Sequence, residues 1–205
     1  MKKNTAPLAP DTFYHIFNRG INKETIFKEK RNYTYFLNKY LKFISPIAHT
    51  YAFCLLKNHF HFLIRTRSEE TLKKIIPEEK GYPTEKIISL QFSHLFNSYA
   101  QAINKRYSRT GGLFETPFRR IEVSEEYYLI QLIAYIHLNP FKHGFTKDYI
   151  NYLYSSYHLL LQGKSKILET DTVMNWFGGP QLFSSFHNNW CETLDFSSKM
   201  TFDFD

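Results

Sequence analysis

The sequence lacks long apolar runs and contains few cysteines. Cys54 and Cys191 are the two cysteines among 205 residues. Two thiols so far apart in sequence predict neither a disulfide framework nor a cysteine-based zinc site, and they favour a reducing compartment. No segment approaches the roughly 18 consecutive apolar residues that a membrane span requires. Met1 to Thr5 precede no apolar signal segment, so we expect a cytoplasmic protein that does not act on a membrane.

Acidic residues are also scarce relative to basic ones. Lys and Arg number 26 against 19 Asp and Glu, which gives a formal charge of +7 and a pI near 9.2. This balance favours a polyanionic partner, nucleic acid before all others, although an ordinary basic protein can have the same composition. The hydrophobic fraction of 43% is enough for a sizeable core, and aromatic residues reach 18%.

The apolar pattern predicts strands and helices in alternation. We expect strands at 13–17, 49–56, 59–65 and 118–123, and helices at 29–44, 87–107 and 124–138. The two-residue connection Lys57-Asn58 indicates a tight antiparallel hairpin. The order β-α-β-β-α-β predicts an α+β fold, a ferredoxin-like antiparallel sheet with helices on one face and with the first and third strands central. Pro140 is expected to stop the last helix.

The C-terminal part is less regular and suggests an extension to the main domain. Residues 173–179 predict a short helix that ends in a glycine cap, and 181–190 predict another helix. We therefore expect a main domain over 1–160 and a partly helical extension over 161–205, with a disordered tail from Ser197.

His59 and His61 lie two residues apart in the third predicted strand. Because strand side chains alternate, both imidazoles should point to one face and Phe60 to the other. Two converging imidazoles can bind a divalent metal that serves phosphate or hydrolytic chemistry. Alone such a pair is more often structural than functional. We do not expect the other seven of the 9 histidines to be ligands.

Tyr135 and Asn139 lie four residues apart in the last predicted helix, so their side chains should stand one above the other. A tyrosine oxygen can attack a phosphodiester and form a covalent phosphotyrosine. With a usual pKa of about 10 it needs a polarised phosphate, a base, or both. A metal ion bound by His59, His61 and the Asn139 oxygen would polarise that phosphate.

Basic residues flank Gly111-Gly112 and the tyrosine helix. They would neutralise phosphates and guide a single strand toward the metal, although each could equally belong to a solvated charged face. These candidate DNA contacts are Lys105, Arg106, Arg109, Arg119, Arg120 and Lys142, and two further candidates at strand edges are Arg19 and Arg65. Tyr107, Phe114 and Phe118 could stack on unpaired bases or pack in the core.

Taken in order, these motifs resemble the single-tyrosine HUH transposases, and within them the repeat-associated (REP-associated) tyrosine transposases. The resemblance runs roughly from Phe13 to Tyr157. Its landmarks are Tyr14-His15-Ile16-Phe17-Asn18-Arg19-Gly20, Asn58-His59-Phe60-His61-Phe62-Leu63-Ile64, Asn104-Lys105-Arg106-Tyr107, Gly111-Gly112-Leu113-Phe114, Phe118-Arg119-Arg120, Tyr135-Ile136-His137-Leu138-Asn139-Pro140 and Ser155-Ser156-Tyr157.

The resemblance implies cleavage of single-stranded DNA at or beside an imperfect hairpin. Tyr135 would join the 5′-phosphate side, release a 3′-hydroxyl, and later be displaced by a 3′-hydroxyl to complete strand transfer. His59, His61 and Asn139 would be the ligands of Mg²⁺ or Mn²⁺. Tyr127 with Gln131 is a second candidate pair, but we prefer Tyr135 because Asn139-Pro140 follows it. The family implies either a monomer or a homodimer.

Two other hypotheses stay open. A non-catalytic protein that binds hairpin DNA would keep the fold and the basic surface without the chemistry. A metal hydrolase could use the histidine pair without covalent catalysis, but it would want a further ligand or a carboxylate base nearby, and no such motif stands out.

Overall fold

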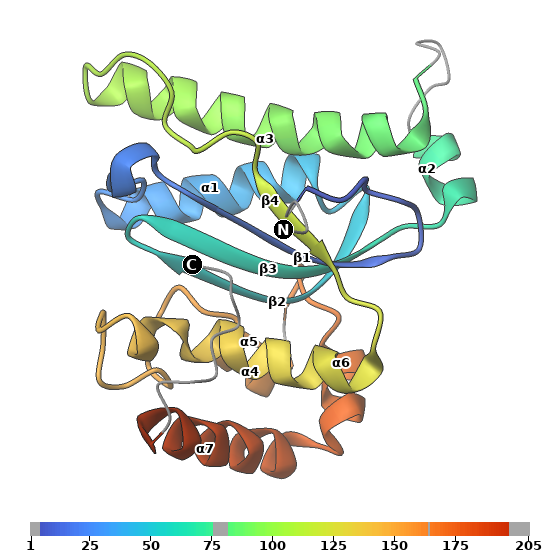
Figure 1. Ribbon diagram of the computed structural model, residues 1–205, viewed down its shortest axis with the longest axis vertical. Coiled ribbons are helices and arrows are strands. Elements are labelled where there is room, and N and C mark those ends of the chain that lie inside the picture. The colour runs from blue at the N-terminus through green and yellow to red at the C-terminus, as the bar shows by residue number, and fades with distance from the viewer. Residues whose placement is uncertain (1–4, 76–81, 164, 197–205) are drawn as a thin grey trace.

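Four strands form one antiparallel sheet at the centre of the molecule (Figure 1). The computed structural model describes residues 5–75, 82–163 and 165–196. The strands are β1 (Phe13–Arg19), β2 (Ala48–Leu56), β3 (His59–Thr66) and β4 (Arg119–Glu122), in the order β2-β3-β1-β4. The first and third strands are therefore central, and β2 and β3 form the antiparallel hairpin, as the sequence predicts.

Helices cover both faces of this sheet (Figure 1). They are α1 (Lys30–Phe43), α2 (Glu69–Ile75), α3 (Thr84–Arg106), α4 (Glu126–Lys142), α5 (Tyr157–Gln162), α6 (Thr170–Phe177) and α7 (Pro180–Phe196), with a short 3-10 helix η1 (Ile21–Lys23). The α+β class is confirmed. The expected placement on one face describes α1 and α3, whereas α4 and the C-terminal helices lie against the other face.

Strand β2 gives the physical reason for the second helical layer. Every residue from Thr50 to Leu56 is buried, although successive side chains of a strand point to opposite faces. A strand without alternation needs cover on both sides. On one face the Tyr40 hydroxyl of α1 lies 2.7 Å from Thr50 Oγ1 of β2, and on the other face α4 packs against β2.

The sequence predicted that this helix would stop at Pro140. Helix α4 instead continues through Pro140 to Lys142. Proline has no N–H, so the helix loses one hydrogen bond, the one that the Ile136 carbonyl would accept, and it ends two residues later. The N–H of His143 donates to the carbonyl of Asn139 at 3.0 Å. Asn139 therefore keeps helical geometry, one turn after Tyr135.

A buried chain of hydrogen bonds joins α4 to the C-terminal extension. His187 Nδ1 lies 2.8 Å from the carbonyl of Phe183, so this nitrogen donates and the neutral ring accepts at Nε2. His137 Nδ1 then donates to His187 Nε2 at 2.8 Å, and Ser156 Oγ donates to His137 Nε2 at 2.7 Å. Burial lowers the pKa of His187 to about 4 and that of His137 well below its usual 6.5. Both rings are thus neutral at pH 7, and each polar atom has a partner.

The short helix with a glycine cap is confirmed as α6, whose C-cap Gly178 has a left-handed backbone, and the last predicted helix is confirmed as α7. The division into domains at residue 160 stays a prediction, and the tail from Ser197 lies outside the described residues. Neither cysteine forms a disulfide. Within the described ranges, no helix has the length and apolar character needed to cross a membrane.

Candidate active site

Four histidines meet on the sheet face that is turned toward α4. The ring of His59 lies 5.3 Å from that of His61 and 4.9 Å from that of His143, measured between centroids. His61 Nδ1 lies 3.0 Å from His15 Nε2, because the antiparallel register places β1 beside β3. Phe60 packs on the other face, against α1 and α3. The alternation predicted for this strand is therefore present.

A hydrogen bond orients each ring of the predicted pair through its Nδ1 atom. His59 Nδ1 donates to Asn58 Oδ1 at 2.8 Å, and His61 Nδ1 is paired with His15. Metal-binding histidines are usually held in this way through the ring nitrogen that does not bind the metal. In the described part of the chain, the other nitrogen of His61, Nε2, is buried and has no hydrogen-bond partner.

Burial keeps the central imidazoles neutral. It lowers the pKa of His61 well below its usual 6.5, and repulsion from His15, His59, His143 and Lys142 lowers this pKa further. Burial likewise lowers the pKa of His15 to about 3. A neutral imidazole is the form that binds metal ions, so the electrostatics of the cluster suit a ligand role.

Helix α4 brings Tyr135 to this cluster. The Tyr135 ring stands edge-on to the rings of His61 and His15, with centroids 5.8 Å and 6.2 Å away. The Lys142 ammonium lies 5.1 Å from the centre of the Tyr135 ring. The Tyr135 ring and the predicted ligand His61 therefore face one another, although they are more than 70 residues apart in sequence.

Asn139, the predicted third ligand, lies one turn after Tyr135 on α4. Its side chain is fully buried, and its Nδ2 donates to the carbonyl of Tyr135 at 3.2 Å. Its Oδ1 is buried without a hydrogen-bond partner among the described residues, as is His61 Nε2. Nitrogen and oxygen donors of this kind suit Mn²⁺ or Mg²⁺. No group of three His, Cys, Asp or Glu side chains within the described ranges has a metal-binding arrangement; the predicted site includes the amide of Asn139 as its third ligand.

The competing tyrosine lies elsewhere on the same helix. The side chain of Tyr127 is 71% exposed. It precedes Tyr135 by two turns, or about 12 Å along the helix axis. The geometry therefore favours Tyr135 over the pair Tyr127 and Gln131 as the candidate nucleophile.

Arg19 and Arg119, two of the predicted DNA contacts, lie beside the histidines. Lys23, which the sequence did not indicate, lies there too. Arg19 and Arg119 both contact the Glu115 carboxylate, at 3.9 Å and 3.3 Å. Next to them a cavity of about 270 Å³ opens, lined by Arg19, Lys23, Asn58, His59 and His143. Its cations make it a suitable entry for a DNA phosphate.

Three other candidate arginines already have protein partners. Arg65, at the opposite end of β3, lies 3.5 Å from the Asp11 carboxylate. Arg109 is 16% exposed and lies 2.5 Å from Glu24. The guanidinium of Arg120 donates to main-chain carbonyls of the N-terminal segment. The structure thus favours the structural interpretation of Arg109 and Arg120, whose cations are not available for phosphates.

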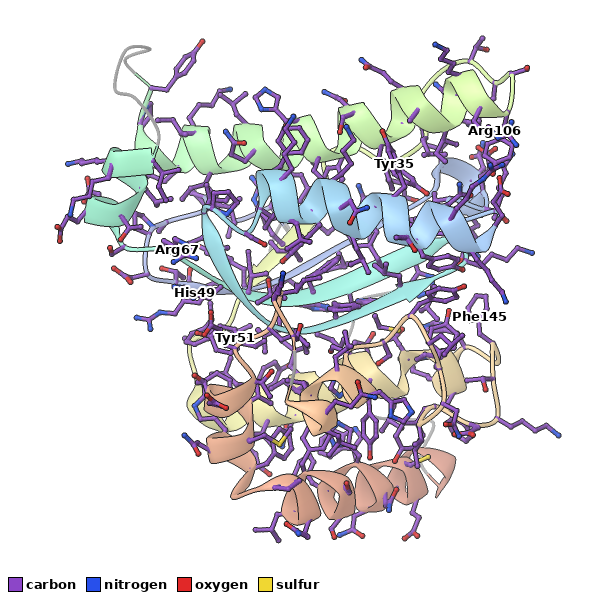
Figure 2. The ribbon with its side chains drawn as sticks, turned by 180° about the vertical axis from the view of Figure 1, so that it is seen from behind. Tyr35, His49, Tyr51, Arg67, Arg106 and Phe145 are labelled. Atoms are coloured by element: carbon purple, nitrogen blue, oxygen red, sulfur yellow. The ribbon has the colours of Figure 1, made fainter. Side chains whose placement is uncertain are left out.

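Lys105 and Arg106 lie on the other side of the sheet from Tyr135. Both are exposed at the end of α3, and Arg106 lies near Tyr35 in the layer of α1 and α3 (Figure 2). A strand bound at the histidines would have to cross the edge of the sheet to meet them.

The sequence did not place His15 or His143 beside the histidine pair, and their positions in the fold explain why. His15 is a single histidine in an apolar strand, and the pairing of β1 with β3 brings it to His61. His143 follows the end of α4, so its place beside His59 depends on where that helix packs. Neither position has a local sequence pattern that could reveal it.

Comparison with known proteins supports the family suggested by the motifs. No family model matches the chain. A Haemophilus influenzae protein assigned by name as a REP-associated tyrosine transposase is 27% identical over 137 residues, which cover 65% of this chain and 69% of that protein. A solved structure of a REP-associated tyrosine transposase bound to a REP hairpin superposes with a TM-score of 0.62 at 14% identity, over 82% of this chain and 90% of that one. The predicted resemblance is confirmed, in sequence by the first and in fold by the second.

Proposed function

We propose that this protein is a transposase of the REP-associated tyrosine type, which cleaves and rejoins single-stranded DNA beside a hairpin through Tyr135. The observation that supports this most is the edge-on approach of the Tyr135 ring to His61 and His15 across the interface of α4 and the sheet. The hairpin as partner follows from the similar protein whose structure contains one.

The covalent step balances without an external reactant. The Tyr135 hydroxyl oxygen forms a bond to phosphorus, and the bond from phosphorus to the 3′ oxygen breaks. The phenol loses one proton and the departing 3′ oxygen gains one. The 5′-phosphate side stays on the enzyme, which conserves the ester bond until a 3′-hydroxyl attacks it and restores the phenol.

The side chains around Tyr135 would divide the remaining tasks. His59, His61 and Asn139 would hold a divalent cation, Mg²⁺ or Mn²⁺, which when bound polarises the phosphate oxygens. The Lys142 ammonium, which lies 5.1 Å from the centre of the Tyr135 ring, would neutralise a phosphate of the bound strand.

DNA would reach the Tyr135 hydroxyl only after a local opening. Tyr135 and His61 are each 2% exposed. Lys142 and His143 lie at the same end of α4, against the rings of Tyr135 and His59. We propose that binding of the strand displaces these two side chains, a shift toward an open state that DNA favours.

A labelled hairpin oligonucleotide with single-stranded flanks tests the proposal. Because the enzyme would keep the 5′-phosphate side, a 3′-end label should migrate with the protein on a denaturing gel after incubation with Mn²⁺. The adduct should disappear in Tyr135→Phe and persist in the matched control Tyr127→Phe. Intact DNA that binds tightly to the wild type would instead indicate a non-catalytic hairpin-binding protein. Cleavage that survives Tyr135→Phe would indicate a hydrolase or another nucleophile.

A further inference from the structure

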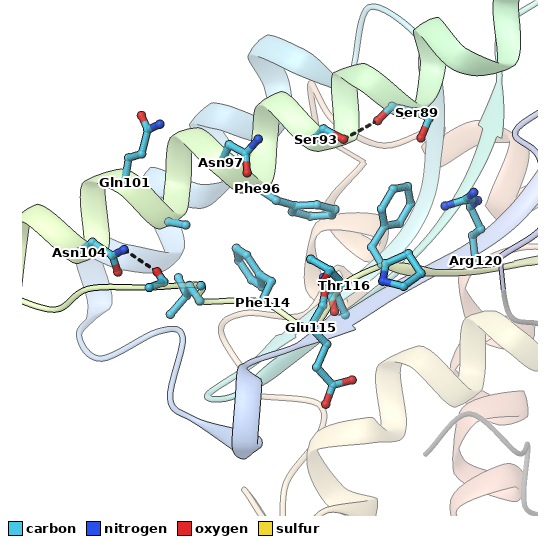
Figure 3. Close-up of a pocket in the computed structure, with 17 residues that line it drawn as sticks. Ser89, Ser93, Phe96, Asn97, Gln101, Asn104, Phe114, Glu115, Thr116 and Arg120 are labelled. Atoms are coloured by element: carbon cyan, nitrogen blue, oxygen red, sulfur yellow. Dashed lines mark hydrogen bonds between the residues drawn. The ribbon is translucent and has the colours of Figure 1, made fainter.

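A cavity of about 490 Å³ lies between α3 and the segment 111–118 (Figure 3). Asn18 and Glu115 line this cavity and also the small hollow in front of His59 and His61. The two spaces are therefore neighbours, on either side of the end of β1. None of the chemistry proposed above uses the larger one.

Three aromatic rings form the apolar wall of the cavity. Phe114 and Phe118 each lie 5.3 Å from Phe96 between ring centroids. These rings keep 5%, 7% and 8% exposure for Phe114, Phe118 and Phe96, whereas Phe60 and Phe62 in the core keep 1%. All three residues line the cavity, so a flat aromatic ligand inside it could contact them.

Uncharged polar groups of α3 line the cavity beside Phe96. Ser93, Asn97 and Gln101 follow at intervals of four residues, so they share one face of the helix. Asn97 and Gln101 are exposed. Among the described residues no hydrogen bond occupies their carboxamides, in contrast to Asn104, which Gly111 and Arg109 hold.

The cavity has no available cation for a phosphate. Arg120 lines it, but its guanidinium is bonded to the carbonyls of Thr5 and Ala6 and lies over the Phe118 ring at 4.8 Å. The Glu115 carboxylate points away from the cavity (Figure 3) toward Arg19 and Arg119. Phosphate binding requires cations that are free to neutralise it. The lining therefore selects a neutral aromatic group with hydrogen-bonding edges.

We infer that this cavity binds an unpaired nucleobase of the DNA strand whose phosphate lies at the histidines. The inference rests on the proposed function and names a subsite for it. Bases extruded from a strand are recognised by stacking on aromatic rings and by hydrogen bonds from amide side chains, which pair with base edges. The three rings and the carboxamides of Asn97 and Gln101 offer both. The volume lies within the usual range of pockets that enclose a small organic group.

Two variants and one control test the inference. Ala100→Trp fills the cavity from α3, where Ala100 is part of the lining. The double variant Asn97→Ala, Gln101→Ala removes both carboxamides without adding bulk, so it remains informative if the tryptophan disturbs folding. Gln91→Ala removes a carboxamide from the same helix at a position outside the cavity lining. Circular dichroism checks that each variant folds.

The probe is a fluorescent hairpin DNA with a randomised single-stranded flank, compared with the same hairpin whose flank is abasic. The two have identical phosphates, so the ratio of their affinities measures the bases alone. In EDTA, fluorescence anisotropy should show the wild type and Gln91→Ala binding the base-bearing flank about 10-fold more tightly, since stacking of one base contributes about 1–3 kcal/mol. The ratio should approach 1 in Ala100→Trp and fall at least about threefold in the double variant. An unchanged ratio in the folded variants, or no preference in the wild type, overturns the inference.

This binding test is independent of the covalent-adduct test. An adduct at Tyr135 without a base-dependent ratio would leave the proposed function standing and reject the base subsite. A base-dependent ratio that the variants abolish, without an adduct, would support the base subsite and reject the proposed cleavage through Tyr135.

Discussion

Acid should loosen the attachment of α4 to the C-terminal extension, and His187 allows a quantitative test. His187 accepts from His137 and donates to the Phe183 carbonyl inside the protein. Burial lowers the pKa of His187 from 6.5 to about 4, so the folded state favours the neutral ring. The stabilising contribution is therefore complete above pH 6.5 and is lost as the pH falls toward 4.

The size of the effect follows from that pKa difference. A shift from 6.5 to about 4 corresponds to a limiting loss of about 3 kcal/mol in the free energy of unfolding. At pH 5 the unfolded chain is almost fully protonated at this residue and the folded protein is not, so about 2 kcal/mol is lost relative to pH 7.5. His137, whose pKa is also lowered by burial, should add a loss of the same sign.

His187→Gln isolates the contribution of His187 protonation to the free energy of unfolding. The amide oxygen of glutamine can still accept the hydrogen bond from His137 Nδ1, but glutamine does not titrate. Urea unfolding followed by far-UV circular dichroism, in EDTA at about pH 7.5 and about pH 5, gives the free energy of unfolding. The wild type should lose at least about 2 kcal/mol more than His187→Gln between these conditions. His94→Gln, at an exposed site on α3, is the matched control and should behave like the wild type. Equal pH dependence in His187→Gln and the wild type would refute the reasoning.

The remaining predictions concern the site. His15→Phe removes the partner of His61 Nδ1 and should weaken Mn²⁺ binding, measured by calorimetry, by about 10-fold or more; unchanged affinity would show that His61 needs no such support. Arg19→Ala should weaken DNA binding and lower the slope of log affinity against log salt by about 1. Arg109→Ala should leave that slope unchanged but lower the free energy of unfolding by about 1–3 kcal/mol, because it breaks the bond to Glu24. A lower salt slope in Arg109→Ala with an unchanged slope in Arg19→Ala would contradict the partners described for these arginines.

The sheet could be predicted because its information is local. The two central strands and the hairpin follow from alternation and from the two residues between β2 and β3. The helical layers were harder to predict. The apolar run of β2 already indicates burial on both faces, but which helix covers the second face depends on contacts between distant segments. The predicted C-terminal end of α4 was wrong because a proline near a helix end costs one hydrogen bond and does not end the helix.

The residues of the site also fall into those that local spacing predicts and those that depend on the fold. The spacing of His59 and His61, and of Tyr135 and Asn139, is local, and each pair lies on one face as predicted. His15 depends on strand register, and Lys23 on the turn after β1, so neither follows from spacing. The arginines show a second limit. Charge composition indicated a polyanion, but it could not separate the cations beside the histidines, such as Arg19 and Lys23, from Arg109 and Arg120, whose guanidinium groups are held elsewhere by Glu24 and by main-chain carbonyls.

The packing of α4 also determines which part of the site can open. From Leu132 to Pro140 every residue is buried, because the sheet lies on one side and the C-terminal helices on the other. After Pro140 the exposure rises at once, and Lys142 is exposed. The missing N–H of Pro140 removes a hydrogen bond between the fixed part and the last turn. Opening should therefore displace Lys142 and His143 while Tyr135 keeps its place. Amide hydrogen exchange should then be faster over residues 141–147 than over 132–139 and should slow there when DNA binds; equal rates in the two segments would mean that the whole helix moves.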